Sequence, residues 1–435
     1  AIPKVERYTV QPRLFVYLSE QTQANFGVNT LFENRLGGDM LYLKGKNSSG
    51  HTYFERNQTK RLSTQFSMEH RFSQRSKLNI RNSYSHFARM ITIPDYVFDG
   101  IQNSTFSEIN GSYTGTQTEW VVGINFWTDM FKERQRDKKV VPLDYEQLTG
   151  GIFVQNLSAI TDRFSIESGL RGDYVADYGF ALLPRLSALF KINRHWTSRV
   201  GGGLGYKTPA IFTEESERIQ YQNVLPVSSD INRLERSYGM NADVNYHTLI
   251  ADKITFSVNQ LFFYTRLNNP LRLLFRSDGN RQFNNLDGYA DTKGVESNVK
   301  LGYENFKFYL GYTFTDAVAK ENVSRYQYPL TPKHRINAVL MYEVEEKWRA
   351  GLEAYYNSSQ LLTDGSTGKA CWVFGAMIER MWEHFSVFIN FENFTDTRQT
   401  RFGSIYSGTV TNPVFKDIYA PLDGFVFNMG IKLRF

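Results

Sequence analysis

The sequence predicts an all-β protein, specifically a transmembrane, up-and-down antiparallel β-barrel. Two observations lead to this prediction. About 20 segments of roughly ten residues alternate apolar and polar side chains, and a tilted strand needs about this length to cross a bilayer. In addition, short polar turns alternate with long links along the chain. Barrels of this class have short turns on one side of the membrane and long loops on the other.

The final segment, which runs from Gly424 to Phe435, shows the alternation most clearly. Lys432 and Arg434 lie on one face, and the other face carries Phe425, Phe427, Met429, Ile431, Leu433 and Phe435. A barrel of this size has a lumen too wide for side chains to fill, so the apolar face has to meet lipid. We therefore expect this strand to close the barrel. Its predicted membrane-insertion signature is Phe427, Ile431, Leu433 and Phe435.

The turns and links divide into two classes by length. Predicted tight turns lie at 73–75, 115–117, 161–163, 193–195, 251–253, 304–305, 345–346 and 381–383. Predicted long links lie at 51–60, 89–104, 132–146, 207–237, 268–292, 316–332, 357–370 and 395–423. Only the link at 177–180 is short on the loop side. A soluble β-sandwich is the alternative, but it would need linkers between two or three domains, and none is visible.

Composition excludes several other classes. No stretch reaches the ~18 consecutive apolar residues of a membrane helix, and the mean hydropathy is −0.42 although 15% of residues are aromatic. The single Cys371 excludes an intramolecular disulfide and a cysteine-based zinc cluster. The net charge of +6 is spread along the chain and gives little support for nucleic-acid binding. The aromatic residues expected in the two interfacial girdles are Tyr84, Trp120, Trp127, Trp196, Trp348, Trp372 and Trp382.

Several segments resemble the barrel of TonB-dependent outer-membrane receptors. They are 32–45, 201–216, 329–343, 388–402 and the terminal aromatic Phe435, and they include Lys207-Thr208-Pro209 and the Asn-x-x-Asn-Phe pattern at Asn390 to Phe394. The resemblance implies a barrel of about 20 to 22 strands around a globular plug. Such receptors begin with the plug, whereas Gln11 to Leu18 already has the pattern of a barrel strand. We therefore expect residues 1–435 to form a single barrel domain, with the plug outside this sequence.

The function implied by the resemblance is active import of a scarce metal chelate across the outer membrane of a Gram-negative bacterium. A ferric siderophore is the first candidate cargo, with TonB as the source of energy. A haem or cobalamin receptor is one alternative, and a passive porin or an adhesin is another. The implied partners are outer-membrane lipid and lipopolysaccharide, the plug, the TonB complex acting through the plug, and the chelate. No nucleic acid, resident cofactor or protein-bound metal is expected.

Two long links combine arginine with aromatic residues, which suits a planar or anionic chelate. The candidate ligand-binding residues are Arg272, Phe275, Arg276, Arg281 and Phe283 in the first link, and Arg398, Arg401, Tyr406 and Tyr419 in the second. Each link also contains three aspartates, so ion pairs that merely hold the loop together are the alternative. The seven histidines show no paired ligand spacing, and no Ser/His/Asp set is recognisable. The sequence therefore predicts no catalytic or metal site, and no enzyme.

Overall fold

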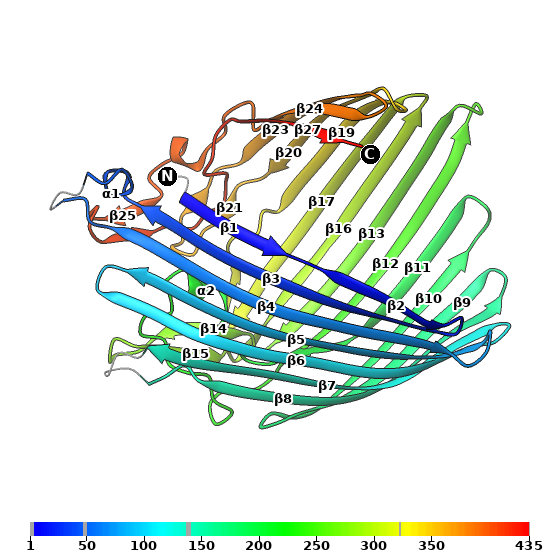
Figure 1. The fold of residues 1–435 in the computed structure, drawn as a ribbon, viewed down its shortest axis with the longest axis horizontal. Helices are drawn as coiled ribbons and strands as arrows, with labels where there is room; N and C mark the ends of the chain where they lie inside the picture. Colours follow the sequence, from blue (N-terminus) through cyan, green and yellow to red (C-terminus); the bar gives the residue numbers. More distant parts are fainter. Residues whose placement is uncertain (1–3, 47–49, 136–140, 322, 435) are drawn as a thin grey trace.

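The computed structural model describes all residues except 1–3, 47–49, 136–140, 322 and 435. One large antiparallel sheet of 21 strands dominates it (Figure 1). Its strands are β1 (Lys4–Val10), β2 (Arg13–Ser19), β3 (Thr22–Gly38), β4 (Phe54–Arg71), β5 (Ser76–Ile93), β6 (Tyr96–Thr114), β7 (Thr118–Gln135), β8 (Tyr145–Thr161), β9 (Phe164–Val175), β10 (Gly179–Lys191), β11 (Trp196–Lys207), β12 (Glu235–Ile250), β13 (Ile254–Asn268), β16 (Gly288–Tyr303), β17 (Phe306–Glu321), β18 (Ser324–Gln327), β19 (His334–Val344), β20 (Trp348–Asn357), β23 (Cys371–Met381), β24 (Phe385–Glu392) and β27 (Val426–Leu433).

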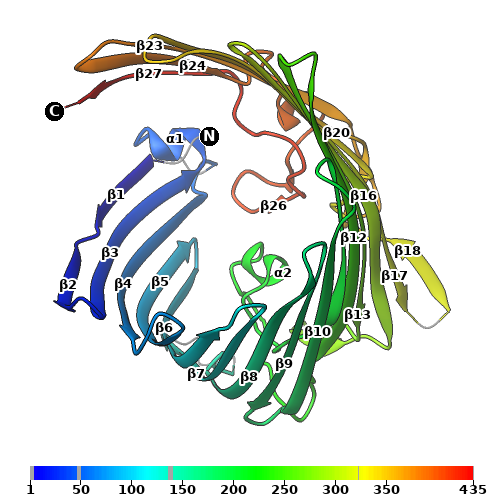
Figure 2. The ribbon, with the colours of Figure 1, turned by 90° about the vertical axis from the view of Figure 1, so that its right-hand side faces the viewer.

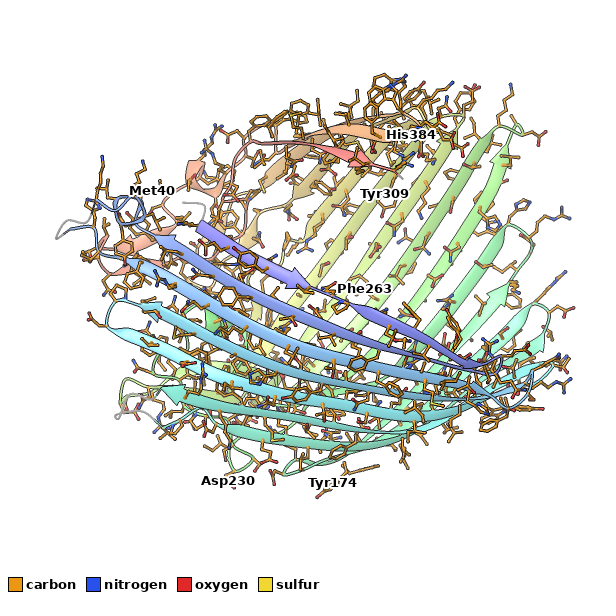
Figure 3. The ribbon with its side chains drawn as sticks, viewed as in Figure 1. Met40, Tyr174, Asp230, Phe263, Tyr309 and His384 are labelled. Carbon is orange, nitrogen blue, oxygen red and sulfur yellow. The ribbon has the colours of Figure 1, made fainter. Side chains whose placement is uncertain are left out.

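The long links contain the remaining elements. These are the two-stranded sheets β14 (Leu271–Phe275) with β15 (Arg281–Asn285), β21 (Gln360–Leu361) with β22 (Thr367–Gly368) and β25 (Tyr406–Gly408) with β26 (Pro413–Phe415), and the short helices α1 (Met40–Leu43), α2 (Glu214–Glu217) and η1 (Gln399–Arg401). Met40 lies at the loop end of the wall and His384 at the turn end (Figure 3). Within the described ranges, no helix has the length and apolar character needed to cross a membrane. The predicted up-and-down antiparallel sheet is confirmed.

One predicted long link is wrong. Residues 89–104 are the ends of β5 and β6, which are joined by a tight turn at Pro94 and Asp95. Asp95 has a φ of 62°, a left-handed conformation that aspartate tolerates in turns. β5 has 18 residues and β6 has 19, whereas about 9–11 residues cross a bilayer. These strands therefore continue beyond the membrane, where their side chains no longer need an apolar face.

The last strand has the two faces that its sequence predicts. Phe427, Met429, Ile431 and Leu433 are exposed on the outside of the sheet. Lys432 lies on the other face, where its Nζ is 3.1 Å from Glu379 Oε1 and 5.1 Å from the centroid of the Phe388 ring. Phe435 lies outside the described residues.

The expectation that β27 closes the barrel is wrong for the part of the chain described here. β27 pairs only with β24, and β1 and β2 pair only with β3, so the sheet is open between them (Figure 2). Both edges run from the loop end to the turn end, so pairing them directly would make a parallel contact. An antiparallel closure requires an odd number of further strands between the two edges.

The lumen face is mainly polar, and several of its aromatic rings lie over glycines of the next strand. Phe263 of β13 faces the lumen, as does Tyr309 of β17 (Figure 3). The Phe263 ring covers Gly294 of β16, where an added Cβ would lie 2.6 Å from it. The absence of a side chain at Gly294 therefore lets a large ring lie flat against the wall.

Trp127 does not belong to the outer girdle, and that expectation is wrong. It lies seven residues after Trp120 on β7, so the two side chains point to opposite faces. Trp120 shares its face with the exposed residues Val122, Ile124 and Phe126. Trp127 shares the lumen face with Asn125 and Asp129.

Candidate functional site

The link between β11 and β12 folds into the lumen, and we call residues 208–234 the inner loop. Its short helix α2 lies inside the curved sheet (Figure 2). Thr213 is the N-cap of α2. Its hydroxyl accepts a hydrogen bond from the Ser216 backbone, and the Ser216 hydroxyl accepts one from the Thr213 backbone, which completes a capping box.

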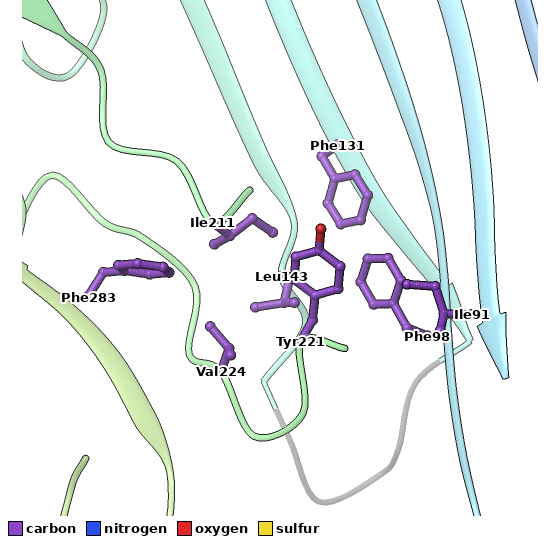
Figure 4. Packing of buried hydrophobic residues seen from close by; sticks show 8 residues of the cluster. All are labelled: Ile91, Phe98, Phe131, Leu143, Ile211, Tyr221, Val224 and Phe283. Carbon is purple, nitrogen blue, oxygen red and sulfur yellow. The ribbon is translucent and has the colours of Figure 1, made fainter. Parts of the chain in front are cut away.

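A buried apolar cluster fixes the inner loop to the wall (Figure 4). The cluster consists of Ile91, Phe98, Phe131, Leu143, Ile211, Tyr221, Val224 and Phe283. The centroids of the Phe98 and Tyr221 rings are 4.5 Å apart, and those of Phe131 and Phe212 are 5.0 Å apart. Burial raises the pKa of the Tyr221 hydroxyl to about 12. The loop therefore has a core of its own, shared with the ends of β5, β6 and β7.

The inner loop also contains strained backbone. Gln220, Tyr221 and Asn223 have φ values of 50°, 63° and 55°, a region that residues other than glycine seldom occupy. Such conformations cost on the order of 1–3 kcal/mol each and persist where packing determines them. The ring contacts of Tyr221 supply that packing.

Polar contacts connect the inner loop to the lumen wall. Arg89 of β5 forms an ion pair with Glu217, with 2.7 Å between Nη2 and Oε1. The side-chain amide of Gln220 donates to Glu55 of β4 at 3.0 Å. The side-chain amide of Gln147 on β8 donates to the Pro209 carbonyl at 2.8 Å. The loop is therefore attached along three strands of one half of the wall.

The β14–β15 hairpin lies on one side of the inner loop. The Arg281 backbone amide donates to the Asn223 carbonyl at 2.7 Å, and the Leu225 amide donates to the Arg281 carbonyl at 2.8 Å. The Leu273 amide donates to the Glu215 carboxylate at 3.0 Å. These contacts join the inner loop and the hairpin into one unit.

The C-terminal loop, residues 393–425, contacts the inner loop through a single carboxylate. Asp417 is buried and forms an ion pair with Arg218 of the inner loop. Asp417 also accepts hydrogen bonds from the backbone amide of Thr363, at 2.6 Å, and from its hydroxyl. The Gln399 side chain organises the C-terminal loop itself by donating to the Asp417 carbonyl and accepting from the Tyr419 and Ala420 amides.

The hairpin holds three of the predicted arginines in different states. Arg276 forms an ion pair with Asp278 at 3.1 Å. Arg272 donates to the Tyr326 hydroxyl at 2.7 Å, and Arg281 donates to the Gln222 carbonyl at 3.0 Å. Within the described residues, neither Arg272 nor Arg281 forms an ion pair. Burial lowers the pKa of the Arg281 guanidinium, as it does for a partly desolvated cation with no anion beside it.

The two predicted arginines of the C-terminal loop share one carboxylate. Arg398 donates to Asp396 at 2.8 Å, and Arg401 forms an ion pair with the same oxygen. The structure therefore places these two cations in an ion-pair cluster within the loop. They have no described contact with Arg272 or Arg281, because the inner loop lies between the two regions.

The predicted aromatic residues also differ in accessibility. Phe275 is 79% exposed at the tip of the hairpin, and the Arg281 guanidinium lies 4.7 Å from its centroid. Phe283 is only 1% exposed and belongs to the buried cluster. Tyr406 is partly exposed on β25, and the Tyr419 ring packs against Gly368. A ligand entering the mouth would therefore reach Phe275 before Phe283.

Sequence reasoning missed the inner loop as part of the site. A signal was present, since Ile211, Phe212, Ile219, Tyr221 and Val224 are apolar residues within a long link. An exposed loop rarely carries so many of them, so their number predicts a folded loop with a core.

The comparisons with known proteins agree with this architecture. The family description "TonB dependent receptor-like, beta-barrel" matches residues 6–394. A search of curated proteins finds no match. Many solved structures share the fold. The siderophore receptor PirA from Acinetobacter baumannii superposes with a TM-score of 0.73 at 15% identity, over 99% of this chain and 71% of PirA.

Two further structures are similar to the same extent. The ferric-catecholate import receptor Fiu from Escherichia coli K12 gives a TM-score of 0.72 at 12% identity, over 100% of this chain and 75% of Fiu. The copper transporter OprC gives 0.75 at 13% identity, over 100% of this chain and 72% of OprC. Identities this low establish the fold alone. The match over residues 6–394 goes further, and the chain belongs to the TonB-dependent receptor β-barrel family.

Proposed function

We propose that this chain forms the wall and the ligand-facing loops of an outer-membrane receptor that imports an iron(III) chelate. A ferric siderophore is the first candidate cargo, and energy comes from the TonB complex through a plug domain in the lumen. Outer-membrane lipid and lipopolysaccharide surround the wall. Family membership supports the location and the energy source.

The observation that supports the cargo class is the state of Arg272 and Arg281. Both cations lie on the β14–β15 hairpin at the loop end of the barrel, and neither is neutralised by a carboxylate of the described chain. A desolvated cation with no counter-ion is unfavourable unless an anion joins it. Iron(III) chelates with carboxylate or catecholate groups supply such an anion, and Phe275 supplies an aromatic surface beside Arg281.

The inner loop favours a receptor over a passive porin. A porin needs an open aqueous path, whereas α2 and the C-terminal loop both extend into the lumen at its loop end (Figure 2). The two loops are also joined by the Arg218–Asp417 ion pair. A haem or cobalamin receptor remains an alternative of the same architecture, and so does a copper transporter, given the similarity to OprC.

Growth under iron limitation tests this proposal. A strain that relies on the intact receptor would receive iron as ferric siderophores, as ferric citrate or as haem, in the presence and absence of TonB. We expect TonB-dependent growth on at least one ferric siderophore. TonB-independent uptake would favour the porin. Growth on haem alone, or a requirement for the receptor only when cobalamin or copper is scarce, would replace the cargo.

A further inference from the structure

Trp127 is the feature of the lumen that the proposed function does not yet use. It is 53% exposed, although it lies on the lumen face, where water rather than lipid surrounds it. Trp120 on the same strand is exposed on the lipid side, where exposure is favourable. A half-exposed tryptophan facing an aqueous lumen forgoes the burial that stabilises aromatic side chains elsewhere. Such a ring is well suited to be covered by a ligand.

Trp127 lines a cavity of about 470 Å³ in the wall next to the inner loop. The cavity also contains Thr149, Arg171, Leu183 and Lys207. Its volume lies within the range of about 300–1,000 Å³ that is typical of small-molecule sites. A cavity of about 150 Å³ already holds a benzene molecule, so a substituted aromatic ring fits here with room for water.

The charged groups that a ligand would meet in this cavity are cationic. Asp173 is buried, and its carboxylate accepts from Arg171 Nε at 2.8 Å and from the Tyr206 hydroxyl at 2.9 Å. Asp129 accepts from the Gln102 amide at 2.8 Å and from the Tyr145 hydroxyl at 3.1 Å. The acids are thus already satisfied by the protein.

Lys207 differs from these acids, because its ammonium group is largely exposed. Its carboxylate neighbour is Glu235, at 3.8 Å, which is beyond hydrogen-bond distance. The ammonium therefore keeps its donors for a ligand. An anion next to an aromatic ring would satisfy both Lys207 and Trp127.

The wall behind the cavity is preorganised. Arg171 is held by Asp173 and donates to Asn125 Oδ1 at 3.2 Å, and Gly151 leaves the space that this network occupies. Asn125 is 6% exposed, and its Nδ2 has no hydrogen-bond partner among the described residues. A buried unpaired donor is unfavourable, so the network is stable enough to tolerate one. Rigid positioning of this kind lowers the entropy that a ligand loses on binding.

We infer that this cavity binds a planar, aromatic, anionic group, with Trp127 stacked on its face and Lys207 paired with its charge. The inference rests on the proposed function, in which such a group is an arm of the iron chelate. It adds a specificity determinant inside the lumen, separate from Arg272 and Arg281 at the mouth. Trp127 would favour chelates with aromatic arms over aliphatic ones.

Binding measurements on the intact receptor in outer-membrane vesicles test this inference. The probes are the iron(III) complexes of salicylate, which is planar and aromatic, and of citrate, which is not. We expect Trp127→Ala to weaken binding of the salicylate complex by about tenfold, the size of a lost stacking contact, and to leave the citrate complex nearly unchanged. Trp127→Phe should restore most of the affinity. Lys207→Gln should weaken binding of both complexes.

Trp120→Ala is the matched control, because it removes a tryptophan from the lipid face of the same strand. It should leave both affinities unchanged. The site is refuted if Trp127→Ala binds both complexes as the unmodified receptor does, or loses both equally. If the unmodified receptor binds neither complex, the site and the iron-chelate cargo fail together. Normal iron uptake with unchanged binding in Trp127→Ala refutes the site alone.

Discussion

The β14–β15 hairpin and the C-terminal loop are similar in sequence but differ in structure. Both combine arginines with aromatic residues at the loop end of the barrel, and both contact the inner loop. The hairpin is joined to the inner loop by backbone hydrogen bonds and by the buried Phe283 ring. The C-terminal loop is joined to it by one carboxylate, Asp417.

The difference shows what decides whether an arginine is available to a ligand. Asp396 precedes Arg398 by two residues and Arg401 by five, and it pairs with both. Asp278 follows Arg276 by two residues and pairs with it. Arg272 has no acid so close in sequence, and Arg281 enters the contact with the inner loop instead. Local acids therefore neutralise local arginines, and the remaining cations are the better binding candidates.

The largest expected effect concerns the apolar side of this comparison. Phe283→Ala should destabilise the contact between the hairpin and the inner loop by about 3–5 kcal/mol, because it leaves a cavity in a packed cluster. Hydrogen exchange of the amides of 219–225 should report the loss of protection. Phe275→Ala on the same hairpin is the control, since that ring is exposed. Equal exchange in both variants would show that the cluster does not hold the loop.

A smaller effect is expected on the charged side. Asp417→Ala should cost about 3 kcal/mol of local stability, the low end for a broken buried pair, because Arg218 still reaches water. Faster exchange should appear at 399–420 and leave the hairpin protected. Asp278→Ala is the control on the exposed pair. Loss of protection in the hairpin as well would mean that the two contacts are not independent.

The smallest effect is a pH dependence of the hairpin turn. A hydrogen bond from the Asn280 backbone lowers the pKa of Asp278, and the Arg276 side chain lowers it further. A carboxylate whose pKa is lowered by folding stabilises the turn above its ordinary pKa of 3.8, and this support is lost as the pH falls through the folded value. Exchange at 276–281 should therefore quicken only below about pH 4. Asp278→Asn should abolish this change, and a transition near neutral pH would contradict the assignment.

The fold was largely predictable from alternation, whereas the site was not. The two faces of β27 follow from a period of two alone, and so do the tight turns. The link expected at 89–104 failed because strands beyond the membrane keep their pairing without keeping an apolar face. The position of Trp127 could have been deduced from its odd spacing from Trp120.

The inner loop was harder to predict, because its contacts join residues far apart in sequence. Arg218 and Asp417 are separated by 199 residues, and nothing local to either indicates the pair. Ion pairs within two residues, such as Arg276 with Asp278, are the kind that sequence can suggest. The predicted ligand arginines were therefore named correctly as a class but could not be ranked.

The most direct test of this account compares chelate binding in two double variants of the intact receptor. Arg272→Gln with Arg281→Gln removes the cations that have no carboxylate partner, and Arg398→Gln with Arg401→Gln removes the pair held by Asp396. The measurement is the Kd for the ferric siderophore that supports growth. The account predicts a loss of about 1.5–3 kcal/mol per desolvated contact in the first variant, roughly ten- to one-hundredfold in Kd, and little change in the second. Equal affinities in the two variants, or a greater loss in the second, would contradict it.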